Sequence, residues 1–271
     1  MGDLKLAAFL AYKTIFKGNR WALVLIVTVM ALSFANLLLT PSILFGVTDT
    51  VNRQQVDALY GDIVVDPPPD QYYLRRADDI TESIAQLPGV SGVAPRLAGS
   101  ALIEYDWKAK DSVFDRGTSG TWALLGIDPD LEASVTTIPD SIIEGSRLEN
   151  GDHDSVLLGV EIAGGERAGT AEFETLGGVV PGERVRITYA NGVQREYTVK
   201  GIVYARESRA DRTAYVTLDE MTSVLGRAVY SSRASQILVS VDDSSDGAAV
   251  IEAIRSLGFP AEVRNWREYG G

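Results

Sequence analysis

The most uneven part of the hydrophobic pattern lies near the start of the chain. From Trp21 to Thr48 there is no charged residue, and the stretch as far as Leu39 is almost purely apolar. An apolar helix of about 20 residues is long enough to cross a hydrocarbon core of about 30 Å. We therefore predict a transmembrane helix over 21–45. Whether the helix continues as a stalk to about residue 58 is not decided by the pattern. Its span residues include Trp21, Leu25, Val29, Leu32 and Leu39.

A cleaved signal peptide is the alternative, because Ser33-Phe34-Ala35 has the small-x-small form of a cleavage site. The apolar run continues past it to Phe45, however, which is longer than the usual signal core and favours an uncleaved anchor. Four basic residues precede the span against one acid, so residues 1–20 should be cytoplasmic and everything after about 46 extracytoplasmic. Residues 1–20 are either a basic interfacial helix along the membrane lipid or a flank that only sets topology.

Two later segments share one pattern of apolar positions. Each opens with a β-branched strand, at 63–65 and at 237–239, followed by an acidic, turn-rich loop. A short helix follows each, with apolar residues at i, i+4 and i+7, and glycine with proline ends it before a further strand. The helical positions are Ile80, Ile84 and Leu87 in the first unit and Val250, Ile254 and Leu257 in the second. Two such units usually form one sheet with both helices on one face.

The segment between the two units is predicted to be mostly β. Alternation over 185–189 and 197–199, with Asn191-Gly192 between them, indicates a hairpin, and 121–128 and 155–160 are further strands. Thr217 to Glu220 has the form of a capping box that opens a short helix, which Gly226 ends.

The predicted fold class is thus α+β: one N-terminal transmembrane helix, then a split two-βαβ, porter-like layer interrupted by a mostly β inserted subdomain. We place the first half of the layer at 59–107, the insertion at 108–233 and the second half at 234–268.

Composition narrows the classes of partner. The chain has 25 basic and 37 acidic residues, and 21 and 36 of these follow residue 45. So acidic an outer region is not expected to bind nucleic acid, which requires a basic footprint. There is no cysteine, so disulfides and thiol catalysis are excluded. Scarce lysine with strong acidity suggests a habitat of high salt.

No motif indicates catalysis, a cofactor or a metal. His153, the single histidine, lies between two aspartates, but three consecutive residues converge poorly on one ion, so we interpret them as a turn. Residues 242–247, DDSSDG, match half of an EF-hand loop, yet position 12 is Ala253, so a helix-capping turn is favoured. The sequence has neither a G-x-x-x-x-G-K-[ST] phosphate loop nor a G-x-S-x-G elbow. A pair of catalytic carboxylates of the glycosidase type is an unfavoured interpretation, because neighbouring carboxylates carry little information in so acidic a chain.

One loop is a candidate contact surface. Residues 67–76, PPPDQYYLRR, combine rigid prolines with Tyr72, Tyr73, Arg75 and Arg76. The same loop could instead be a connection that packs on its own domain.

The whole arrangement resembles the permeases of the macrolide-exporter, lipoprotein-release and FtsX-like ABC transporter superfamily, with their MacB-type extracytoplasmic core domain. The resemblance rests on the basic flank and long span, on "PGVSGVAPRLAGSALI" after the first helix, on "LLGIDPD", "IIEGSRL" and "SVLLGVEIA", on the hairpin segment, and on "VRNWRE". It implies a subunit that is not itself an enzyme, that dimerises with a second copy or a paralogue, and that works with a cytoplasmic ATP-binding cassette subunit.

In such a permease the outer domain couples ATP-driven motion to export or extraction of a lipid, lipoprotein, peptide or drug-like substrate. Family permeases have three further spans after the outer domain, whereas this sequence stops at Gly271. Two alternatives therefore stay open: a single-pass, membrane-anchored sensor or adaptor domain, and a tethered hydrolase that uses carboxylates.

Overall fold

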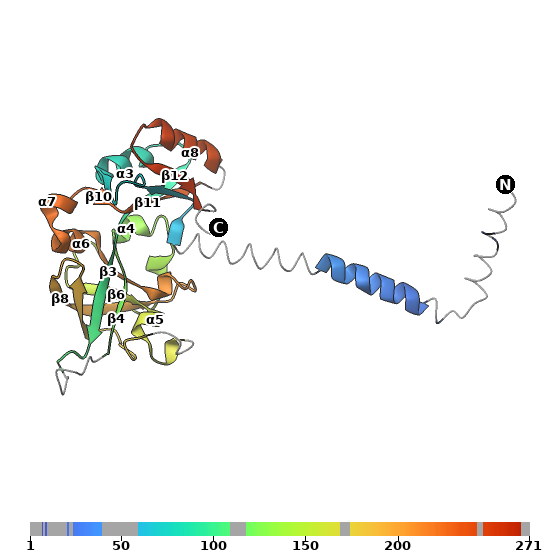
Figure 1. The fold of residues 1–271 in the computed structure, drawn as a ribbon, viewed down its shortest axis with the longest axis horizontal. Coiled ribbons are helices and arrows are strands. Elements are labelled where there is room, and N and C mark those ends of the chain that lie inside the picture. The colour runs from blue at the N-terminus through green and yellow to red at the C-terminus, as the bar shows by residue number, and fades with distance from the viewer. Residues whose placement is uncertain are drawn as a thin grey trace. The chain divides into compact units, whose positions relative to one another are not determined.

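The computed structural model describes residues 59–108, 118–168, 174–242 and 246–266, together with 24–39 and residues 7, 9 and 21 (Figure 1). The chain divides into two compact units, Met1–Arg53 and Gln54–Gly271, which are treated separately below.

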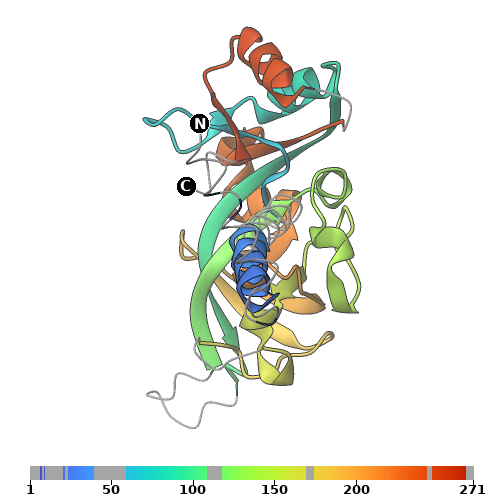
Figure 2. The same cartoon turned by 90° about the vertical axis from the view of Figure 1, so that its right-hand side faces the viewer.

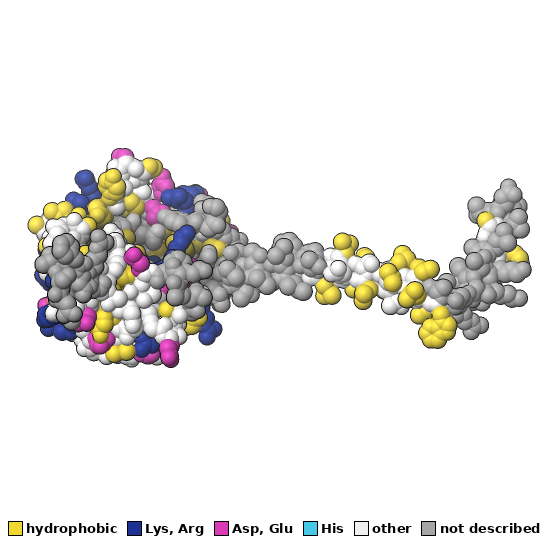
Figure 3. All heavy atoms as spheres, turned by 60° about the horizontal axis from the view of Figure 1, so that its bottom comes forward, with side chains coloured by type: hydrophobic (Ala, Val, Ile, Leu, Met, Phe, Trp, Pro, Cys, Tyr) yellow, Lys and Arg dark blue, Asp and Glu magenta, His cyan; other side chains and the backbone are white. Residues whose placement is uncertain are grey.

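In the first unit, residues 24–39 are helical, as is Trp21. Their side chains are exposed, including all five predicted span residues, and Figure 3 shows apolar side chains along this helix. Among the described residues, no helix has both the length and the apolarity needed to cross a membrane. The span over 21–45 therefore stays a prediction. Residues 40–58, with the rest of that span and the stalk, lie outside the described residues, as does nearly all of the interfacial helix at 1–20.

The second unit begins as an antiparallel, four-stranded layer in the order β12-β1-β11-β3. Helices α3 (Ala77–Ala85) and α8 (Gly247–Ser256) both pack on one face of it, around Ile63 and Val239. These are the two strand–helix–strand units that the sequence predicts, and they share one sheet. The strands are β1 (Ile63–Asp66), β3 (Val90–Tyr105), β11 (Gln236–Val241) and β12 (Glu262–Asn265).

Strand β3 belongs to two parts of the sheet (Figure 2). Its first half pairs with β11, and its second half pairs with β4 on one side and β7 on the other. From there the strands close into a ring, β3-β4-β9-β6-β8-β7, whose interior holds the largest cluster of buried apolar residues. The ring strands are β4 (Thr118–Ile127), β6 (Ser155–Gly159), β7 (Arg184–Tyr189), β8 (Gln194–Val203) and β9 (Thr213–Thr217), and β5 (Ile142–Gly145) adds to β8.

Local sequence explains the starts of two helices, α6 and α8. Thr217 accepts a hydrogen bond from the Glu220 N–H to begin α6 (Leu218–Leu225), and Gly226 ends it. Asp246 caps α8 in the same way, as the interpretation of DDSSDG expects. The predicted capping box also assigns the Glu220 side chain to this cap. In the structure the Glu220 carboxylate instead accepts hydrogen bonds from Tyr197 and Arg195.

Short helices complete the fold and contribute to the sites described below. They are α4 (Pro129–Glu132), α5 (Val160–Ala163), α7 (Arg227–Tyr230), and the 3-10 turns η2 (Ile138–Asp140), η3 (Gly165–Arg167) and η4 (Ala210–Arg212). A separate two-stranded sheet joins β2 (Leu74–Arg75) to β10 (Arg233–Ala234). The mixed α+β class is confirmed, and the subdomain boundaries at 107 and 233 stay predictions.

Candidate functional site

The predicted contact loop is partly packed and partly free in the structure. Tyr72 is 87% exposed, whereas Tyr73 meets Tyr230 edge to face with ring centroids 5.3 Å apart. Burial, together with the neighbouring Tyr230, raises the pKa of Tyr73. Arg75 pairs with Arg233 in the two-stranded sheet, so the loop is tied to the segment that follows α7. The sequence left open whether this loop is a contact surface or a connection packed on its own domain. Tyr73 packs on its own domain, whereas Tyr72 is exposed and available for contact.

Backbone strain is concentrated where the loop meets α3. Arg76 has φ 57° and Ser232 has φ 107°, both in a region that non-glycine residues rarely occupy. The two positions are linked, because the Ala77 N–H donates to the Ser232 carbonyl at 3.0 Å and the Asp78 N–H donates to the Ser232 hydroxyl at 3.4 Å. The Arg76 side chain folds back onto Asp79 at 2.6 Å.

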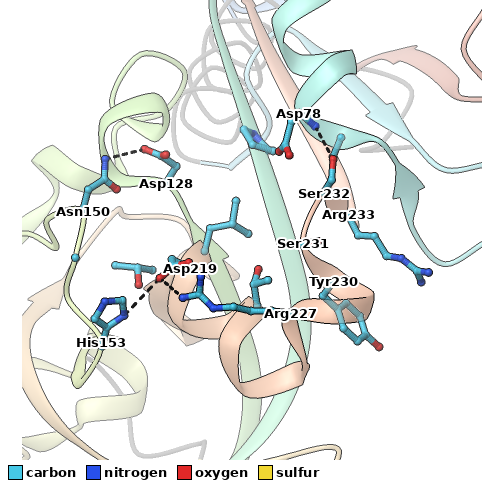
Figure 4. A pocket seen from close by; sticks show the side chains of 16 residues that line it. Asp78, Asp128, Asn150, His153, Asp219, Arg227, Tyr230, Ser231, Ser232 and Arg233 are labelled. Carbon is cyan, nitrogen blue, oxygen red and sulfur yellow. Dashed lines mark hydrogen bonds and ion pairs between the residues drawn. The ribbon is translucent and has the colours of Figure 1, made fainter.

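A pocket of about 450 Å³ lies beside this loop and is called the interlayer pocket below (Figure 4). One wall comes from the four-stranded layer and its connections, and the other from elements attached to the ring. The lining residues used below are Asp78, Asp128, Asn150, His153, Asp219 and Arg227.

Ion pairs organise the ring-side wall of this pocket. The Asp219 carboxylate lies between Arg227, at 2.7 Å, and the His153 Nδ1, at 3.6 Å (Figure 4). His153 also lies 3.8 Å from the Glu220 carboxylate, which is 1% exposed and accepts hydrogen bonds from Tyr197 at 2.6 Å and Arg195 at 2.8 Å. Burial raises the pKa of Tyr197 well above its usual range, so this hydroxyl stays protonated and donates to Glu220.

A second set of polar contacts, made by the lining residues Asn150 and Asp128, lies near His153 in the pocket wall. Asn150 donates to Asp130 at 2.8 Å and to Asp128 at 3.4 Å, and Asp128 caps α4 through the N–H groups of Asp130 and Leu131. His153 lies in a bend, as the sequence predicts. Its approach to Asp219 was not predictable from spacing, because it results from the antiparallel pairing of β6, the strand after His153, with β9, the strand before α6.

The pocket is lined by both apolar and polar groups, and two of its charged side chains, Asp219 and Arg227, are paired with each other. Among the described residues, no cluster of three or more His, Asp and Glu side chains could hold a metal ion. The arrangement is suited to holding two layers at a defined spacing, or to binding a polar group between them.

A buried ion pair lies at the start of the second unit and was missed by sequence reasoning. Arg96, on β3, and Glu132, at the end of α4, are 3% and 0% exposed. The Arg96 Nε donates to Glu132 at 3.1 Å, its Nη1 donates to the Leu59 carbonyl at 2.7 Å, and Thr136 donates to Glu132 at 2.6 Å. Burial opposes the charge of Arg96, but the attraction of Glu132 outweighs it, and the pKa of Arg96 is raised. One guanidinium therefore joins Leu59, the long strand and α4.

Comparisons with known proteins agree with this architecture. A family model described as the MacB-like periplasmic core domain matches residues 23–257. The crystal structure of the periplasmic region of MacB from Actinobacillus actinomycetemcomitans is similar at 15% identity, with a TM-score of 0.52, over 81% of this chain and 95% of that one. The extracellular domain of the noncanonic ABC-type transporter YknZ from Gram-positive bacteria is similar at 12% identity, with a TM-score of 0.51, over 75% and 97%. No curated protein matches the chain.

Proposed function

The chain belongs to the family of MacB-like periplasmic core domains of ABC-type transporter permeases, and on that premise we propose that it is the N-terminal part of such a permease subunit. Its extracytoplasmic domain would couple ATP-driven motion to export or extraction of a lipid, lipoprotein, peptide or drug-like substrate. Residues 21–45 would anchor it in the cell membrane, with the N-terminus in the cytoplasm.

The observation that carries this proposal is the contact of Arg96 with Leu59. Leu59 is the first described residue of the second unit, and its carbonyl is held by a guanidinium of the strand that runs into both the layer and the ring. A displacement of the chain at residue 59 would therefore act on β1 through the backbone and on β3 through Arg96. Both paths are rigid elements with buried side chains, as mechanical coupling requires.

Under this proposal, ATP hydrolysis and the rest of the membrane-spanning transport unit are supplied by other subunits. A cytoplasmic ATP-binding cassette subunit would supply hydrolysis, because this sequence has no phosphate loop. A second permease copy or a paralogue would complete the transport unit, and membrane lipid would surround residues 21–45. Tyr72, Arg75 and Arg76 would contact a protein partner, because an exposed aromatic beside arginines on a strained, fixed backbone is a common form of interface anchor.

The test measures motion across the interlayer pocket in native membranes. Because the chain has no cysteine, the pair Asp78→Cys and Asn150→Cys provides its only two labelling sites, on opposite walls, and a mock-labelled wild-type membrane gives the background signal of other proteins. We expect the distance distribution between the labels to change when ATP and vanadate are added to inside-out vesicles. A control pair within the ring, Ser100→Cys and Gln194→Cys, should not change.

Two further results separate the alternatives. An ATPase activity that copurifies with the tagged chain would support the permease. Unchanged distances with ATP and no copurifying ATPase would contradict the coupling proposal and would favour the anchored sensor or adaptor.

A further inference from the structure

A second pocket, of about 650 Å³, lies near Leu59 on the outer side of the strands, and it shares with the function proposed above only its lining residues Leu59 and Arg96. It is called the arginine-rimmed pocket here. Its lining comes from four places: the start of the second unit, β3 with β4, the segment around η4, and β11. The lining residues used below are Leu59, Tyr60, Arg96, Ala98, Ala123, Leu125, Arg209, Arg212 and Thr213.

The floor of this pocket is apolar and made of small side chains. Ala98 pairs with Leu125 across β3 and β4, and Ala123 pairs with Thr213 across β4 and β9, so these residues share one outward face of the sheet. Ala98 and Ala123 are exposed. Alanine at two neighbouring outward positions leaves a hollow that larger residues would fill, and Leu59 and Leu125 add apolar walls.

The rim carries three guanidinium groups, which differ in how their charges are balanced. Arg96 is neutralised by Glu132 inside the molecule, and Arg212 lies 2.8 Å from Glu161. Arg209 is exposed and donates to the Tyr60 hydroxyl, a neutral partner. Within the described part of the chain, no carboxylate forms an ion pair with Arg209. The Arg209 side chain therefore presents an exposed guanidinium at the rim, while the buried Glu207 carboxylate accepts hydrogen bonds from the backbone N–H groups of Arg209 and Ala210, both at 2.8 Å.

We propose that this pocket binds an amphipathic anion, a molecule with one phosphate or carboxylate group on a single apolar chain. The apolar part would lie on the alanine floor, and the anionic group would accept hydrogen bonds from Arg209 at the rim. A volume of about 650 Å³ suits a single-chain ligand. The inference does not rest on ATP-driven coupling, since binding is measured in the absence of ATP.

The test uses the full chain in phosphatidylcholine nanodiscs and a photoreactive dodecyl phosphate as the probe. Mass spectrometry of the labelled peptides should place the label on segments 59–60, 96–98, 123–125 or 208–213. Replacing a charged hydrogen-bond donor changes affinity by about tenfold, so Arg209→Gln should reduce labelling there about tenfold. Arg184→Gln, which removes an exposed arginine of β7, is the matched control and should leave labelling unchanged.

A second variant tests the floor. Ala123→Leu fills the hollow at an exposed position, so it should abolish labelling without changing the denaturation midpoint. A photoreactive dodecanol should label the pocket at least tenfold less than the phosphate. If the alcohol labels equally, or if Arg209→Gln and Arg184→Gln behave alike, the proposal is wrong.

Competition identifies the source of the ligand. Dissolved hexyl phosphate that suppresses labelling would support a soluble amphiphile, and suppression only by phosphatidic acid in the nanodisc would support a membrane lipid. Suppression by inorganic phosphate as strong as that by hexyl phosphate would show a simple anion site and would overturn the amphipathic assignment.

Discussion

At the scale of single residues, the buried charges decide how the second unit holds together. A fully buried ion pair adds little net stability when it replaces apolar packing, but removing one partner leaves an isolated charge in the interior. Arg96 and Glu132 are in that position, and Arg96 also satisfies the Leu59 carbonyl. The main effect of this ion pair is therefore to fix the positions of Leu59, β3 and α4 relative to one another, and its contribution to net stability is small.

Arg96→Met should destabilise the chain by about 3–5 kcal/mol, since Glu132 would be left buried without its partner. Chemical denaturation measures the change. Arg76→Met, which breaks an exposed pair with Asp79, is the control and should cost less than about 1 kcal/mol. Adding Glu132→Met to Arg96→Met should recover part of the loss. A double variant as unstable as the sum of the two single variants would contradict this account.

The second residue-scale prediction concerns pH. Burial raises the pKa of Asp211 to about 6 from its usual 3.8, with Glu161 and Glu207 nearby adding to the effect. Because the folded chain binds this proton more tightly than the unfolded chain, the contribution of Asp211 to stability is fully present below about pH 4. It is lost as pH rises through about 6.

Asp211→Asn should remove that pH dependence while keeping an acceptor for the Ala205 N–H. The free energy of unfolding of the variant should rise relative to that of the wild type as the pH increases from 4 to 7, and the rise should total about 1–3 kcal/mol. Denaturant titrations at several pH values measure the difference. A constant difference across this range would show that Asp211 is not the titrating group.

At the scale of elements, close backbone contacts fix how the strands and short helices approach one another. At the junction of β6 and α5, the backbone of Gly159 lies against the Asp211 carbonyl, and a side-chain Cβ at this position would collide with that oxygen. The φ of Gly159 is −61°, so the requirement for glycine comes from space and not from backbone conformation.

Gly159→Ala should therefore cost about 1–3 kcal/mol, because a backbone carbonyl cannot move aside as a flexible side chain can. Gly247→Ala is the matched control: nothing lies within 4 Å of its added Cβ, and it is the first residue of α8. The control should be neutral or slightly stabilising, since alanine favours helices over glycine. Thermal denaturation of the two variants measures the difference, and equal midpoints would contradict the packing argument.

At the scale of the whole molecule, the proposed topology makes a prediction that needs no knowledge of the substrate. Because the sequence has no cysteine, Tyr72→Cys and Lys13→Cys each give a single labelling site. A membrane-impermeant maleimide added to intact cells should label Tyr72→Cys, which is exposed in the structure. Lys13→Cys, in the predicted cytoplasmic flank, should be labelled only after permeabilisation. The reverse pattern would overturn the proposed orientation.

The predictable part of the fold consists of features with local causes. Alternation and helical spacing located β1, α3, β11 and α8, and the caps at Thr217 and Asp246 set the starts of α6 and α8. Tyr72 and Tyr73 show the limit of this reasoning. Adjacent in sequence and alike in type, they differ in exposure because Tyr230, from a distant segment, covers only one of them.

By itself, the sequence determined the two strand–helix–strand units, the hairpin between them, the mixed α+β class, the resemblance to a permease family and the absence of thiol chemistry, because these depend on composition and on periods of a few residues. Tertiary structure alone decided that β3 would serve both the layer and the ring, that Arg96 would meet Glu132 and Leu59, and that Arg209 would border an alanine floor. The two contacts of Arg96 join residues 36 and 37 positions apart. Their partners are selected by packing and desolvation, which no local pattern records.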